Sequence, residues 1–157
     1  MTRQIHDRII VDGSTCPLYS RSPLNIFSSN KELSIGQIMS LCEPRRTDNQ
    51  RGFVAEWEID NNFLFLIKIK PASLFVKLFP DQSGRIEASW FSGDICIPQG
   101  DRHTDSGLYF DYEDFSEYDH YRVLRLEAGK VIKIDIVDAS YMRGQDETRR
   151  RGLYKFD

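Results

Sequence analysis

The stretch GLYFDYEDFSEYDHY, residues 107–121, brings six aromatic rings and five carboxylates together within fifteen positions. Side chains of these types could form a catalytic carboxylate pair, a metal-binding loop or a surface that recognises a partner. A calcium loop needs carboxylates at the spacing D-x-[DN]-x-[DN]-G, and Asp111, Glu113 and Asp114 do not have it. We therefore expect neither a metal site nor a cofactor here.

The same stretch is better suited to recognition. Tyrosine rings give large, stiff contact areas with a polar tip, and neighbouring carboxylates attract basic partners. Residues 101–121 carry seven carboxylates against Arg102 alone, a net charge of −6 in a chain whose total is −3. The sequence thus predicts a non-enzymatic binding protein with a basic protein partner, in one version an immunity or antitoxin-like protein. The predicted contact residues are Tyr109, Asp111, Tyr112, Glu113, Tyr118 and Asp119.

A catalytic function has weaker support in the sequence than a recognition function. Glu56 and Glu58 lie two apart on one strand face, a spacing compatible with a retaining glycoside hydrolase, but glutamates on the solvent face of a strand are common. There is no G-x-S-x-G elbow, phosphate-binding loop or dinucleotide fingerprint. The three cysteines form no CxxC pair, and Cys96 lies in an apolar run where a thiol is normally a buried filler. We assign no catalytic residue and lean against an enzyme.

An alternative function is a small-ligand-binding β-barrel, or an enzyme built in its pocket. Its ligand residues would be Arg51, Trp57, Trp90 and Gln99, with Arg51 receiving an anionic group. The competing interpretation is that Arg51 is a surface charge at the start of a strand and that the tryptophans fill the core.

Three hairpins are expected to position these side chains. They are residues 8–20 around Asp12-Gly13, residues 51–70 around residues 60–62, and residues 121–138 around Ala128-Gly129. In the second hairpin, alternation places two sets of side chains on the inward faces. The sets are Phe53, Ala55, Trp57 and Ile59, and Phe63, Phe65, Ile67 and Ile69.

Further elements are less regular. Residues 73–80 are expected to form a short helix or a strand, residues 85–92 and 95–98 strands, residues 108–112 a strand and residues 32–41 a short helix. No strand–helix–strand rhythm is present, so a parallel α/β sheet is disfavoured. The predicted fold class is mainly β, an antiparallel barrel or sandwich of successive hairpins with one or two short helices. Residues 1–140 form one β-rich domain, and residues 141–157 a polar, basic tail that is flexible in one interpretation.

Composition and charge restrict the class of protein and its cellular location. Forty per cent apolar and 29 per cent charged residues are typical of a globular protein, and no window approaches a membrane span. The net charge of −3 argues against nucleic-acid binding, which normally uses a basic face. Charges interrupt the only apolar run near the start, unlike a signal peptide. Three widely separated cysteines favour a reducing, cytoplasmic location.

Two motifs resemble a group of short bacterial proteins. RGFVAEWEI, residues 51–59, is similar to the group's Arg-Gly-aromatic-x-Ala-x-Trp-Glu-Ile strand, and WFSGDICIPQG, residues 90–100, to its Trp-Phe-Ser-Gly…Ile-Pro-Gln-Gly segment. The resemblance spans roughly residues 5–138. The group has no assigned activity, so it implies no catalytic residue. Between residues 100 and 118 the group tends to have a loop rich in Gly, Tyr, His and Met, where this chain is far more acidic.

Overall fold

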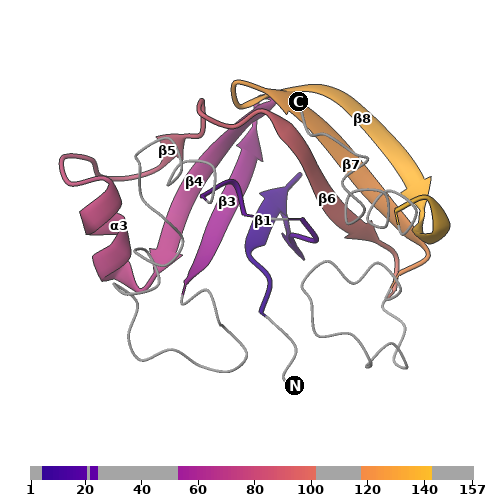
Figure 1. The fold of residues 1–157 in the computed structure, drawn as a ribbon, viewed down its shortest axis with the longest axis horizontal. Coiled ribbons are helices and arrows are strands. Elements are labelled where there is room, and N and C mark those ends of the chain that lie inside the picture. The colour runs from indigo at the N-terminus through magenta and orange to yellow at the C-terminus, as the bar shows by residue number, and fades with distance from the viewer. Residues whose placement is uncertain (1–4, 21, 25–52, 102–117, 143–157) are drawn as a thin grey trace, which may run out of the picture.

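The computed structural model describes residues 5–20, 22–24, 53–101 and 118–142 (Figure 1). Within them eight strands form one mixed sheet in the order β2-β1-β3-β4-β8-β7-β6, with β5 beside β4. The strands are β1 (Arg8–Val11), β2 (Ser14–Pro17), β3 (Val54–Asp60), β4 (Phe63–Lys70), β5 (Ile86–Glu87), β6 (Gly93–Gln99), β7 (His120–Glu127) and β8 (Lys130–Asp138). The prediction of a mainly β fold is confirmed.

The sheet is open, so the structure does not support a barrel. β4 and β8 meet only where Phe63 lies opposite Lys130. Figure 1 shows β3 and β4 sloping away from β6, β7 and β8 below this joint. Most strand pairs are antiparallel, as expected, but β1 runs parallel to β3. The sequence gives no sign of this pair, because parallel partners are distant in the chain and no turn residue marks them.

The three predicted hairpins are confirmed, and their turns explain them. Both central residues have positive φ in each turn, at Asp12-Gly13, Asn61-Asn62 and Ala128-Gly129. A two-residue turn with two positive φ angles matches the right-handed twist of the flanking strands. The predicted strand over residues 95–98 is also confirmed, as the centre of β6.

Residues 73–80 form a helix rather than a strand, α3 (Ala72–Leu78). Leu74 and Leu78, four residues apart, share its buried face. The predicted strand over residues 85–92 is wrong beyond β5, because the chain turns at Ala88, whose carbonyl accepts the Phe91 N–H at 3.1 Å. The elements expected over residues 32–41 and 108–112 lie outside the described residues.

The inward face predicted for the start of β4 is wrong. Leu64 and Leu66 are fully buried, whereas Phe63 and Phe65 are half-buried on the other face. The pairing changes from Glu56 opposite Lys68 to Trp57 opposite Leu66, so Ile67 is an extra, bulged residue. One extra residue reverses the alternation along the strand, which periodicity alone cannot reveal.

Among the described residues, two apolar clusters hold the fold together. The larger one, on the inner face, includes Trp57, Leu66, Ile95 and Leu124. The second consists of Tyr19, Cys96, Tyr121 and Met142, and it lies on the opposite face of β6 because Cys96 follows Ile95. Met142 is only 8% exposed, so packed structure extends past residue 140. None of the helices in the described ranges is long and apolar enough to cross a membrane.

Candidate recognition site

The open end of the β6–β7 hairpin carries the described part of the predicted contact surface. Gln99 opposite His120 is the last pair of this ladder, and residues 102–117 between the two strands lie outside the described residues. Four of the predicted contact residues fall there, namely Tyr109, Asp111, Tyr112 and Glu113. The other two, Tyr118 and Asp119, stand directly before β7.

Tyr118 is fixed by other rings. It is half-buried and meets Tyr19 edge-on, with ring centroids 5.6 Å apart at 87°, and Tyr121 with centroids 6.0 Å apart at 73°. The His6 ring in turn stacks on the Tyr19 ring, with centroids 4.1 Å apart and an angle of 12° between the ring planes. Edge-to-face ring pairs contribute roughly 0.5–1.5 kcal/mol each beyond area burial. We call His6, Tyr19, Tyr118 and Tyr121 the ring cluster.

Backbone contacts place the ring cluster on β6. The Tyr19 N–H donates to the Cys96 carbonyl at 2.8 Å, and the Cys96 N–H donates to the Ser20 hydroxyl oxygen at 3.3 Å. His6 Nδ1 lies 3.1 Å from the Leu18 carbonyl oxygen, which can only accept, so Nδ1 carries the hydrogen of this bond. The chain on both sides of the first hairpin is therefore tied to β6, the strand that leads to the candidate recognition site.

Exposed carboxylates surround this end of the sheet. Asp101, Asp119 and Asp138 are all exposed, and Asp138 lies opposite His120 in the β7–β8 ladder. The Asp138 carboxylate accepts the Tyr141 N–H at 2.7 Å, and the Asp119 carbonyl accepts the Ala139 N–H at 2.9 Å. The acidic character predicted for residues 101–121 thus extends to the end of β8.

The four residues of the alternative ligand site do not all come together. The Trp57 and Trp90 rings lie 6.3 Å apart at 59°, but Trp57 is fully buried in the larger apolar cluster. The Trp90 Nε1–H donates to the Pro23 carbonyl at 2.9 Å. Gln99 lies at the far end of β6, about 20 Å along the strand from Gly93, and Arg51 lies outside the described residues.

Asp7 is a buried carboxylate that the sequence analysis did not single out. It is 3% exposed, and its two oxygens accept the Ala55 N–H at 3.0 Å and the Trp57 Nε1–H at 3.1 Å. Nothing in the segment HDRII distinguishes this aspartate from a surface charge. Its bonds hold the residues before β1 against β3.

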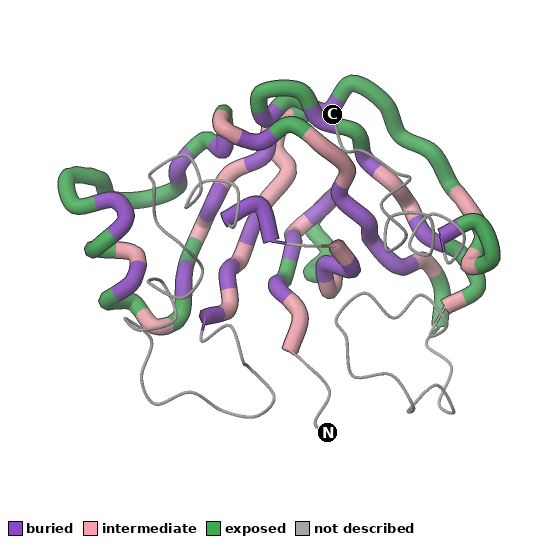
Figure 2. Tube along the Cα trace, in the orientation of Figure 1, coloured by how far each residue is buried: buried purple, intermediate pink, exposed green. Residues whose placement is uncertain are grey.

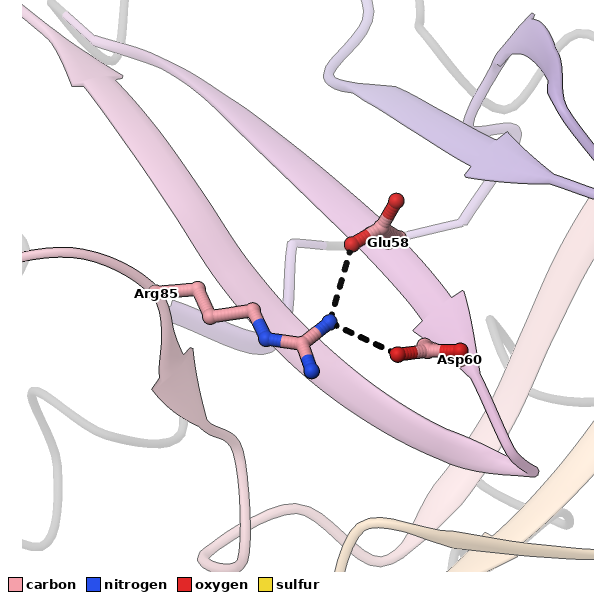
Figure 3. A network of polar contacts seen from close by, with 3 residues as sticks. All are labelled: Glu58, Asp60 and Arg85. Atoms are coloured by element: carbon pink, nitrogen blue, oxygen red, sulfur yellow. Dashed lines mark hydrogen bonds and ion pairs between the residues drawn. The ribbon is translucent and has the colours of Figure 1, made fainter.

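Of the two glutamates proposed as a carboxylate pair on β3, Glu58 belongs to an ion-pair network with Asp60 and Arg85 (Figure 3). Arg85 Nη1 lies 3.1 Å from Glu58 Oε1 and 2.9 Å from Asp60 Oδ2, and its guanidinium sits 3.9 Å over the Phe65 ring. The hydrogen bond to Asp60 is the main cause that raises the pKa of Arg85. The Glu58 carboxylate is therefore already paired with Arg85, on an exposed face of the sheet. Across the ranges that the structure describes, no three His, Cys, Asp or Glu residues are grouped to hold a metal ion.

Comparison of the chain with family models, with curated proteins and with solved structures finds no match in any of the three. A function for this chain therefore has to be argued from its own residues, above all the ring cluster and the exposed carboxylates beside it.

Proposed function

We propose that this chain is a non-enzymatic recognition protein that binds a basic protein partner through residues 107–121. The observation that supports this most is the packing of Tyr118, which two buried tyrosines hold just before β7. A rigid anchor lowers the entropy lost when neighbouring residues bind a partner. Asp119, directly after the anchor, is exposed to solvent.

The charge of the surface indicates the partner's chemistry. Asp101, Asp119 and Asp138 are exposed around the anchor, and clustered carboxylates raise the association rate of a basic partner. An immunity or antitoxin-like role against a basic toxin is one form of this proposal. Cys16 and Cys96 are free thiols, which supports a reducing cytoplasm as the location. We also propose membership of the bacterial group that shares the RGxxAxWEI and WFSGxxxIPQG motifs.

A small-ligand site at Arg51, Trp57, Trp90 and Gln99 has less support. The two tryptophans pack together, but the indole N–H of Trp57 is already bonded to Asp7 and Gln99 lies at the other end of β6.

The test is capture of the partner from the native host with tagged protein, followed by native mass spectrometry. We expect a stoichiometric basic protein. Replacing Asp111, Glu113 and Asp114 together by Lys should abolish capture while the circular dichroism spectrum stays unchanged. Capture that survives this triple reversal contradicts the proposed surface.

A matched control separates local charge from total charge. The triple variant Asp81→Lys, Glu87→Lys, Glu127→Lys changes the net charge by the same amount at exposed positions outside residues 107–121. It should retain capture. A co-purifying small molecule in place of a protein would favour the alternative ligand site.

A further inference from the structure

The inner face of the sheet continues onto β8, beyond the larger apolar cluster. Ile95 lies opposite Leu124, and Leu124 lies opposite Ile134, in the regular part of the β7–β8 ladder. Opposed residues in antiparallel strands share one face, so Ile134 and its second neighbour Ile136 are on the inner face. The first two residues are buried, whereas Ile134 and Ile136 are 54% and 59% exposed, and Figure 2 shows most of β8 as exposed.

The exposed apolar side chains of the described residues gather at this part of the sheet. Apart from Val76 on α3, the large apolar side chains that are exposed all lie on β8 or just after it, namely Ile132, Ile134, Ile136 and Tyr141. Single apolar residues scattered over a surface are ordinary, but a contiguous group indicates a binding site. We therefore ask which chemistry the inner face of β8 would bind.

Arg122 places a positive charge beside these isoleucines. It lies opposite Ile97 of β6 and Ile136 of β8, and so on the same inner face. Only 22% of its side chain is exposed. Its ion-pair partner is Asp12 in the turn of the first hairpin, with Oδ2 3.6 Å from Nη1, a distance too long for a hydrogen bond.

The guanidinium of Arg122 is poorly compensated for a group so far buried. Its Nε is buried, and within the part of the chain that the structure describes it has no hydrogen-bond partner. Asp12 is 87% exposed, and such an exposed partner at this distance contributes little. Buried charged groups are normally hydrogen-bonded, so this guanidinium favours a further anion. Because Nε is buried, the anion would bind at the Nη1 and Nη2 end.

We propose that the inner face of β7 and β8 binds an apolar carboxylate, with the carboxylate on Arg122 and the hydrocarbon part on Ile134 and Ile136. The planar donors of arginine match a carboxylate. Side chains of directly opposed residues start about 5 Å apart, so one small molecule can reach both Arg122 and Ile136. Each partner of a stable protein complex covers roughly 800 Å², far more than two half-exposed isoleucines offer. The proposal does not depend on the recognition function.

Octanoate is the probe for the first test, titrated into the full chain by isothermal calorimetry. Octanol has the same aliphatic chain without the charge, and acetate has the charge without the chain. We expect octanoate to bind about tenfold more tightly than either. Equal affinities for octanoate and octanol would show that the arginine takes no part, and a chain that does not bind octanoate would overturn the proposal.

Two charge variants test the contact with the carboxylate. Arg122→Gln should weaken octanoate binding about tenfold and leave octanol binding unchanged. Asp12→Asn removes a carboxylate that competes for the same guanidinium, and it should tighten octanoate binding about threefold. Asparagine tolerates the positive φ of residue 12, so the turn is kept. Octanoate affinity that neither variant changes would overturn the assignment of Arg122.

A third variant tests the apolar part of the site. Ile136→Thr keeps a branched strand residue but removes apolar surface, so it should weaken octanoate and octanol alike. Val76→Thr is the matched control, since Val76 is 62% exposed on α3, and it should change neither affinity. Equal effects of the two variants would show that the hydrocarbon binds elsewhere.

Thermal unfolding separates a ligand-binding arginine from a structural one. Arg122→Met keeps an unbranched apolar stem and removes a charge with an uncompensated Nε, so the Tm without ligand should stay the same or rise. Octanoate should raise the Tm of the original chain and leave that of Arg122→Met unchanged. A marked fall in Tm for Arg122→Met without ligand would mean that its pair with Asp12 stabilises the fold, which would overturn the proposal.

Discussion

The carboxylate of Asp7 accepts the indole N–H of Trp57 at 3.1 Å inside the core. This bond, with a second one from the Ala55 N–H, ties the segment before β1 to β3 across the parallel pair of strands. The parallel pair has no connecting turn to hold it in register. Side-chain bonds at its start therefore have a larger role than in the hairpins.

Replacing Asp7 by Ala should destabilise the fold by about 3 kcal/mol, because two buried N–H groups lose their acceptor. Asp7→Asn keeps one acceptor oxygen, so its free energy of unfolding should fall by roughly half as much. Urea unfolding followed by fluorescence measures both. Asp101→Ala, at an exposed position, is the control and should have little effect. A loss no larger for Asp7→Ala than for this control would show that the bonds contribute nothing.

Gly129 should tolerate no side chain. Its φ is +80°, and an added Cβ would lie 2.7 Å from the Ala88 carbonyl oxygen. Gly129→Ala combines left-handed strain with a backbone clash, and we expect a loss of about 3 kcal/mol. Gly13 has nearly the same φ, +78°, with no atom within 4 Å of an added Cβ. Gly13→Ala should therefore lower the free energy of unfolding by only about 1 kcal/mol. Thermal unfolding measures both variants, and equal losses of stability would contradict the clash at Gly129.

The ring cluster should contribute to both stability and recognition. Tyr118→Ala removes two edge-on contacts and should lower stability by about 2 kcal/mol and weaken partner capture. Tyr118→Phe keeps both ring contacts, so stability should change little, and any loss of capture then reports on the hydroxyl. Unchanged capture by Tyr118→Ala would remove Tyr118 from the contact surface.

Local signals predicted the hairpins well. Asp12-Gly13 and Ala128-Gly129 occupy turns with positive φ, a requirement that is visible in the sequence because few residue types satisfy it. The bulge at Ile67 and the parallel contact of β1 with β3 depend on tertiary packing and left no local signal. For the candidate recognition site, the sequence showed the acidic and aromatic composition. It did not show the stacking of His6 on Tyr19, because these two residues share no motif.

The reversed face of β4 gives a test that distinguishes the sequence pattern from the structure. Alternation without a bulge places Phe65 inward, whereas the structure buries Leu66 completely and leaves Phe65 half-buried beneath Arg85. Leu66→Ala should therefore destabilise the protein by about 3 kcal/mol, because a fully buried side chain leaves a cavity. Phe65→Ala, although it removes the larger side chain, should lose only about 1 kcal/mol, largely the contact with Arg85. Urea unfolding of the two variants decides the matter, because the order of the two losses reverses if Phe65 faces the core.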